Sequence, residues 1–104
     1  PVHREMLLRT PGEETRVTRA TSGRPARAIV NRYIAELDAD GPEPLAYPLQ
    51  YSRTGPLSAA ARKEDSVDLM VMWAGQAAAL AKPMPAAGLL AKLAADAQAT
   101  LAKP

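Results

Sequence analysis

The chain has 104 residues, no cysteine, no phenylalanine and a formal net charge of +2. Of its 49 hydrophobic residues, 22 are alanine, so only 27 larger apolar side chains remain to fill a core. The composition excludes a disulfide framework, a cysteine nucleophile and a thiolate metal site, and no apolar run approaches the roughly 20 residues that span a bilayer. The chain therefore forms either a weakly stabilised helical domain or part of something larger, because each buried alanine removes little apolar area from water.

The first 40 residues predict a short helix, a short extended segment and a longer helix. An apolar cluster over 3–9 indicates a helix that ends before the Pro-Gly pair at 11–12. β-branched residues at alternate positions indicate an extended segment over 15–19, followed by a turn at 21–24. Apolar residues at helical spacing, with Pro25 at the first helical position, predict a helix over 25–38.

The remaining chain is broken repeatedly by proline. After a loop over 38–48 we expect a helical turn over 49–53, a helix that restarts at 54–56 and runs to about residue 65, and a short extended piece over 66–72. An alanine-rich helix to about residue 81 and a last helix over 85–102 follow. The predicted fold class is mostly α, with about five short helices.

Charge and composition also limit the location and the partners. The absence of cysteine and of an apolar leader favours a cytoplasmic protein that does not enter a membrane. Arginine dominates the first third of the chain, but the net charge is small and no aromatic residues lie among the arginines. We therefore expect a solvated face or internal ion pairs with glutamates 13, 14 and 36, and no nucleic-acid partner.

The sequence offers few residues for a metal site or for acid–base catalysis. His3 is the only histidine, and beside Arg4 and Glu5 near one end of the chain it is expected to be a solvated helix residue. One histidine without cysteine does not make a transition-metal site, and the carboxylates over 36–43 lack the pattern of a cation-binding loop. No catalytic and no metal-binding residue is predicted.

Two short segments carry more information. Ser22, Gly23 and Arg24 precede the expected start of a helix, where uncovered N–H groups and an arginine favour an anion, although the same residues also make an ordinary turn. Trp73 lies two residues before a glycine that permits close approach, and Gln76 both donates and accepts hydrogen bonds. This segment suits a flat cofactor, or else it is a core tryptophan at a strand-to-helix turn.

Three segments in order resemble one enzyme family. They read TRATSGRPAR at 18–27 with NRYI at 31–34, AYPLQ at 46–50 and MWAGQ at 72–76. They are similar to the TRAFSGRPARG…NRF, PYPLQ and LWAGQ segments of bacterial nitronate monooxygenases, the 2-nitropropane dioxygenase-like flavoproteins, and the last helix is similar to theirs. Thr21 stands where the family usually has phenylalanine, so apolar packing is lost or moved there.

The resemblance implies a fold larger than this chain. Residues 1–65 would form most of a helical insert, and residues 66–104 would return to an FMN-dependent (β/α)8 barrel and end in its C-terminal helix. The family's catalytic histidine and its glycine-rich FMN-phosphate loops have no counterpart here. The implied contacts to flavin or substrate are Trp73, Gly75 and Gln76; Ser22, Gly23 and Arg24 hold the insert's turn or face the cleft; Tyr47 and Gln50 line the interface between insert and barrel.

The implied activity is oxidation of alkyl nitronates by FMN and O2, and the implied partner is the rest of the barrel, without which the chain is inactive. Two alternatives stay open. One is a stand-alone helical protein-interaction module, and the other is an FMN-dependent NADH:quinone or enoyl reductase with the same barrel. If the barrel reading is right, apolar surface should be exposed on the last helix and around Trp73.

Overall fold

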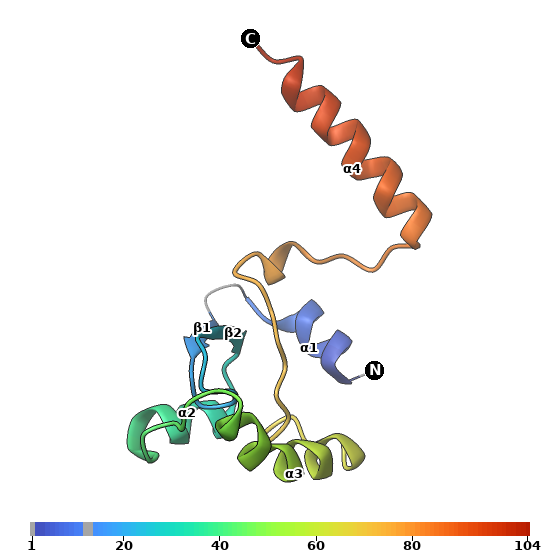
Figure 1. Cartoon of the computed structure of the whole chain (residues 1–104). Coiled ribbons are helices and arrows are strands. Elements are labelled where there is room, and N and C mark those ends of the chain that lie inside the picture. The colour runs from blue at the N-terminus through green and yellow to red at the C-terminus, as the bar shows by residue number, and fades with distance from the viewer. Residues whose placement is uncertain (1, 12–13) are drawn as a thin grey trace.

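The computed structural model describes residues 2–11 and 14–104 and is mostly helical, as predicted (Figure 1). The first helix was expected to end before the Pro-Gly pair at 11–12, and position 12 of that pair lies outside the described residues. The elements in chain order are α1 (Val2–Arg9), β1 (Thr15–Thr18), β2 (Ala26–Ile29), α2 (Arg32–Asp40), α3 (Leu49–Lys63), the 3-10 helix η2 (Ala78–Leu80) and α4 (Ala86–Leu101).

Strands β1 and β2 form an antiparallel hairpin in which Thr15 pairs with Ile29 and Thr18 pairs with Ala26. The extended segment expected over 15–19 is confirmed. The helix expected over 25–38 is wrong in its first half, because residues 26–29 are a strand whose backbone is paired with β1. The spacing of apolar residues does not distinguish a helix from a strand over so short a stretch. The pairing with β1 selects the strand.

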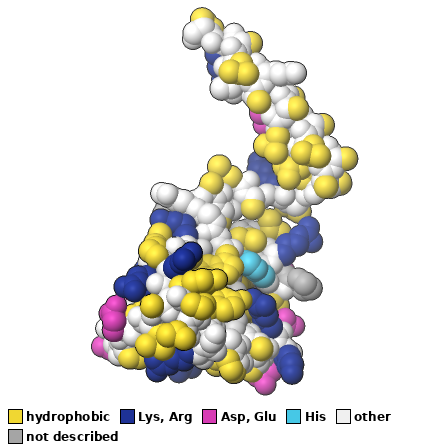
Figure 2. Space-filling model, viewed as in Figure 1, with side chains coloured by type: hydrophobic (Ala, Val, Ile, Leu, Met, Phe, Trp, Pro, Cys, Tyr) yellow, Lys and Arg dark blue, Asp and Glu magenta, His cyan; other side chains and the backbone are white. Residues whose placement is uncertain are grey.

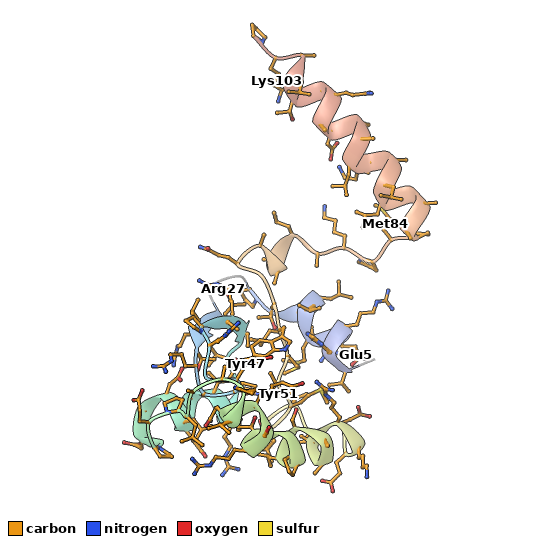
Figure 3. The ribbon with its side chains drawn as sticks, viewed as in Figure 1. Glu5, Arg27, Tyr47, Tyr51, Met84 and Lys103 are labelled. Atoms are coloured by element: carbon orange, nitrogen blue, oxygen red, sulfur yellow. The ribbon has the colours of Figure 1, made fainter. Side chains whose placement is uncertain are left out.

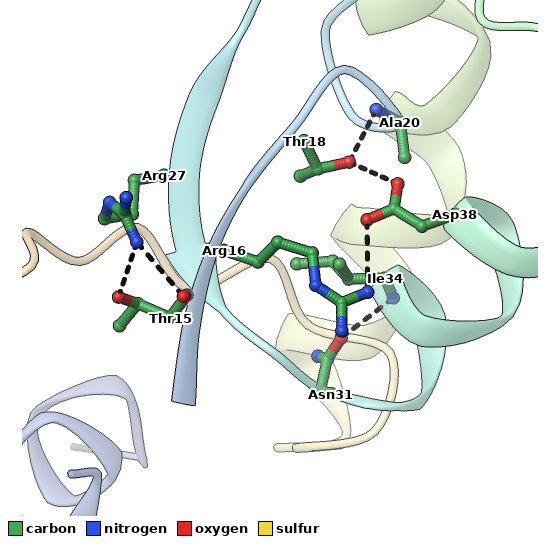
Figure 4. A network of polar contacts seen from close by, with 8 residues as sticks. All are labelled: Thr15, Arg16, Thr18, Ala20, Arg27, Asn31, Ile34 and Asp38. Carbon is green, nitrogen blue, oxygen red and sulfur yellow. Dashed lines mark hydrogen bonds and ion pairs between the residues drawn. The ribbon is translucent and has the colours of Figure 1, made fainter. Parts of the chain in front are cut away.

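Asn31 starts α2 in place of Pro25. Its side-chain oxygen accepts the Ile34 N–H at 3.2 Å, and its amide nitrogen donates to the carbonyls of Val67 and Met70, both at 2.8 Å. The first bond is the usual N-cap, and the other two fix the chain beyond α3 against the start of α2. Figure 4 shows the cap within the polar network around β1.

The extended residues 70–74 lie beside β2 and are joined to it by an isolated antiparallel bridge between Ala28 and Trp73. The Ile29 N–H donates to the Met72 carbonyl at 2.9 Å, and the Ala74 N–H donates to the Arg27 carbonyl at 3.2 Å. The extended piece expected over 66–72 is therefore shifted, because residues 67–69 form a turn. The helix expected up to residue 81 is reduced to η2. The largest fully buried side chains are Ile29, Ile34 and Met72.

Helix α3 is one continuous helix, although two helical pieces separated near Thr54 were expected. Pro56 lies inside it. An interior proline keeps a helical φ, but it removes its own N–H donor and its ring crowds the carbonyl four residues earlier, so the helix continues with a weakened hydrogen-bond pattern at this point. Only Gln50 and Ala61 of this helix are buried.

Helix α4 projects away from the other elements and has no buried residue (Figures 1 and 2). The radius of gyration is 16.8 Å, whereas a compact domain of this length has about 13 Å. The exposed fraction of its four leucines runs from 45% to 85%: Leu89, Leu90, Leu93 and Leu101. The expectation of exposed apolar surface on this helix is confirmed.

Gly23 occupies a position that only glycine fits. Its φ is +85°, and a Cβ there would lie 2.3 Å from the Leu45 carbonyl oxygen and 2.8 Å from the Tyr47 nitrogen. We predict that Gly23→Ala lowers the free energy of unfolding by about 2 kcal/mol or more, because left-handed strain adds to a backbone clash. Urea denaturation measures this. Gly55→Ala is the matched control: a Cβ there meets nothing within 4 Å, so alanine within the helix should be neutral or stabilising. Equal losses would contradict the argument.

Ionisation of Tyr33 makes the free energy of unfolding depend on pH in the alkaline range. Burial raises its pKa above the ordinary value of 10.0, and the neighbouring hydroxyls of Thr54 and Thr21 act in the opposite direction. A raised pKa means that the folded chain holds the phenol proton more tightly than the unfolded chain does. The resulting stabilisation is complete below the unfolded pKa and is lost as the pH rises through the folded one.

We therefore predict that the unfolding free energy falls more steeply above about pH 10 for the unaltered chain than for Tyr33→Phe. Denaturant titrations at several pH values between 8 and about 11 compare the two slopes. Parallel slopes would show that ionisation of Tyr33 is not coupled to folding.

Candidate functional site

Trp73 lies at the point where a buried extended segment reaches the surface. Met70, Val71 and Met72 are at most 5% exposed, whereas Trp73 is 37% exposed. Its backbone is held by an antiparallel bridge to Ala28. The interpretation of Trp73 as a core tryptophan is therefore wrong, and the expectation of exposed apolar surface around it is confirmed.

His3 of α1 forms a hydrogen bond to the backbone of Trp73. Its Nε2 donates to the Trp73 carbonyl at 2.9 Å, since a carbonyl oxygen only accepts. His3 is a partly exposed residue of helix α1, as expected, and it also joins α1 to the Trp73 segment across 70 positions of sequence. No local signal in the sequence indicates this contact.

Gly75 and Gln76 continue from Trp73 on the surface. Both are exposed, and a Cβ built at Gly75 would meet no atom within 4 Å. Packing within the described residues therefore gives no reason for glycine at this position. The open space beside its backbone would admit a ligand or another chain segment.

Ser22, Gly23 and Arg24 lie in the hairpin loop, and no helix begins behind them. The predicted anion site at a helix start is therefore wrong, because Pro25 leads into β2. The Ser22 hydroxyl instead exchanges hydrogen bonds with the Arg24 backbone at 3.2 and 3.3 Å. The Arg24 guanidinium lies over the Tyr47 ring, 4.5 Å from its centre, in a cation–π contact.

Gln50 is buried and links α3 to the hairpin loop and to the segment before α3. It is 6% exposed, its Nε2 donates to the Ala20 carbonyl at 2.6 Å, and its Oε1 accepts the Leu45 N–H at 3.1 Å. Its expected place at an outer interface is therefore wrong. Tyr47 and Tyr51 flank the start of α3 and are half exposed, so they remain open to other contacts (Figure 3).

Most arginines of the first third are engaged within the chain. Arg27 donates to both oxygens of Thr15, and Arg16 pairs with Asp38 at 3.6 Å (Figure 4). Arg19 pairs with Glu43 at 3.2 Å, and Arg32 with Glu36 at 2.7 Å. Internal ion pairs were expected, but only Glu36 among these partners was foreseen; position 13 lies outside the described residues.

One small pocket brings Trp73 together with α3 and the hairpin loop. Its volume is about 130 Å³. Its lining residues are Thr21, Tyr51, Thr54, Gly55, Ser58, Ala59, Arg62, Val71 and Trp73. Thr54 closes one side by donating its hydroxyl to the Thr21 carbonyl at 2.8 Å. Of the three residues expected to contact flavin or substrate, Trp73 is the one that lines this pocket.

The described residues contain no group of three or more potential metal-ligating side chains. No helix in the described part of the chain is long and apolar enough to cross a bilayer.

Comparisons with known proteins agree with the motifs. The model of the family described as nitronate monooxygenase matches residues 1–96. The chain is 44% identical to a nitronate monooxygenase of Paraburkholderia phytofirmans over 88% of its own length and 25% of the relative's. It is 41% identical to one from Pseudomonas aeruginosa, covering 88% of this chain and 26% of that protein.

A solved structure is similar over almost the whole chain. A crystal structure of nitroalkane oxidase from Streptomyces ansochromogenes superimposes with a TM-score of 0.83 at 38% identity, covering 97% of this chain and 29% of that one. The chain therefore spans about a quarter of the length of the curated relatives that it matches. With the family model matched over nearly all of its length, this chain belongs to the nitronate monooxygenase family.

Proposed function

We propose that this chain is the C-terminal part of a cytoplasmic, FMN-dependent (β/α)8-barrel enzyme that oxidises alkyl nitronates with O2. The observation that carries the proposal is the partly exposed Trp73, which follows the buried residues 70–72 and is followed by open space at Gly75. Family membership supplies the reaction class, and the quarter-length coverage of the relatives supplies the inference of a larger enzyme.

The residues around Trp73 fit a flavin ring on its flank. An exposed indole offers an aromatic face, the space beside Gly75 accepts a flat group, and Gln76 presents an amide that donates and accepts hydrogen bonds. A phosphate site is not formed by the Ser22–Arg24 loop either. The Ser22 hydroxyl donates to the Arg24 carbonyl, and the Arg24 guanidinium lies over the Tyr47 ring, so both groups already have partners within the chain. When bound, FMN would accept electrons from the nitronate and pass them to O2.

The contribution of this chain is then positioning rather than proton transfer. Trp73 and Gln76 orient the ring edge and the substrate, and Trp73 shields them from water. The His3 bond to the Trp73 carbonyl and the bridge to Ala28 fix that backbone. A rigidly held contact loses less entropy on binding than a mobile one.

The same proposal divides the chain into two parts. Residues 1–65 form most of a helical insert, and residues 66–104 return to the barrel. The leucines of α4 would pack against the outside of the barrel, because exposed apolar patches of this kind usually mark an interface.

In such a full-length polypeptide, we predict that Trp73→Ala weakens FMN binding or lowers kcat/KM for a small alkyl nitronate by about tenfold or more. Flavin fluorescence titration and nitronate-dependent O2 uptake are the measurements. Val17→Ala, an exposed apolar position on β1, is the control and should leave both unchanged. A polypeptide with neither bound FMN nor nitronate-dependent O2 uptake would refute the enzymatic proposal.

The docking of α4 has its own test. Leu93→Asp should change the unfolding temperature of the 104-residue chain little, because Leu93 is 56% exposed. In the full-length polypeptide it should lower that temperature by about 5 °C or more. Ala95→Asp places the same charge about 200° around the helix from position 93 and should be nearly neutral in both. Equal effects of the two substitutions in the full-length polypeptide would exclude docking through this face.

A further inference from the structure

The peptide unit between Trp73 and Ala74 is held at both of its polar ends. Its N–H, which belongs to Ala74, donates to the Arg27 carbonyl at 3.2 Å. Its carbonyl, which belongs to Trp73, accepts a hydrogen bond from His3 Nε2 at 2.9 Å. A trans peptide unit is a rigid plane whose N–H and carbonyl point in opposite directions, so contacts at both ends fix its orientation. The Trp73 side chain therefore leaves a backbone that is held from two sides.

Helix α1 brings His3 to this carbonyl by packing against the core. Met6 and Leu7 lie against the buried cluster that contains Met72. His3 precedes Leu7 by four positions, so the two side chains share a face of the helix. The helix also packs against η2, and it therefore contacts the chain both before and after the peptide unit that His3 holds (Figure 1).

The backbone just beyond this peptide unit has more freedom. Gly75 follows Ala74, and a Cβ built at Gly75 would meet no atom within 4 Å. A glycine in open space can adopt many combinations of φ and ψ. The pairing with β2 holds only the N–H end of the Trp73–Ala74 unit. The hydrogen bond from His3 is therefore what holds the carbonyl end against rotation next to the glycine.

We infer that His3 is a positioning residue for the surface that Trp73 presents to the flavin. It acts through the Trp73 carbonyl and sets the direction of the indole and of the open backbone at Gly75. It works by this hydrogen bond and not by proton transfer. The role rests on the proposed function, since it assumes that Trp73 contacts a flavin. The hydrogen bond itself requires no flavin and can be tested separately.

Hydrogen exchange of the Ala74 amide, followed by NMR, measures how firmly this peptide unit is held. His3→Asn should raise its exchange rate by about threefold to tenfold, because one hydrogen bond is lost. His3→Gln should restore the slow rate, since the glutamine side chain reaches about as far as Nε2 and that of asparagine is one methylene shorter. The Ile29 amide, which donates to the Met72 carbonyl at 2.9 Å, is the internal control and should respond much less.

Trp73 is the only tryptophan of the chain, so fluorescence anisotropy reports the motion of its indole directly. His3→Asn should increase the fast, nanosecond loss of anisotropy, and His3→Gln should behave as the unaltered chain does. Arg4→Gln is the matched control, since Arg4 is the next residue of α1 and is exposed. Far-UV circular dichroism checks that each variant is folded.

In the full-length polypeptide, His3→Asn should weaken FMN binding by about threefold or more, and His3→Gln should restore it. The pH profile of kcat/KM should keep its shape in both variants, because His3 transfers no proton.

The inference is overturned if the Ala74 and Ile29 amides respond equally, if the asparagine and glutamine variants behave alike, or if FMN binding is the same in all three polypeptides. An unaltered full-length polypeptide that binds no FMN would instead refute the proposed function, and the role toward the flavin with it. In that case the Ala74 exchange rates would still show whether His3 holds the peptide unit.

Discussion

The structure depends on the hydrogen bonding of β2 along both of its edges. On one edge its backbone pairs with β1, and on the other it exchanges hydrogen bonds with Met72 and Ala74. Buried backbone groups without partners are costly, so this double pairing is what allows Ala28 and Ile29 to be at most 1% exposed. Helix α1 and the end of α3 then pack against the same buried cluster.

The pocket and the exposed tryptophan both follow from that pairing. The β1–β2 hairpin carries a loop whose carbonyls, at Ala20 and Thr21, accept hydrogen bonds from Gln50 and Thr54 of α3. The extended segment 70–74 brings Trp73 to the surface next to the same helix. Segments separated by about 50 positions in the sequence thus meet at one place, and the core fixes their relative positions.

The alanine-rich composition has a different consequence. A chain with few large apolar side chains forms a small core, yet this one leaves the leucines of α4 and much of Trp73 in contact with solvent. Burying those side chains would contribute about 1.5–3 kcal/mol each. A partner surface is the physical reason to keep them apolar, and membership of a family whose curated members are covered by this chain over only about a quarter of their length agrees with this.

The sequence by itself determined the local elements: α1 from its apolar cluster, β1 from alternating β-branched residues, and α4 from an uninterrupted apolar stripe after Pro85. It also identified the family from the order of three motifs, and it singled out Trp73. These features are readable because each depends on neighbouring residues.

The tertiary structure alone decided that residues 26–29 are a strand, because their spacing fits both periods and only the partners on either edge select one. It also decided that Gln50 is buried, that His3 contacts a carbonyl 70 residues away, and that Trp73 faces outward. Each of these depends on which distant segment lies alongside, and that is information no single stretch of the chain contains.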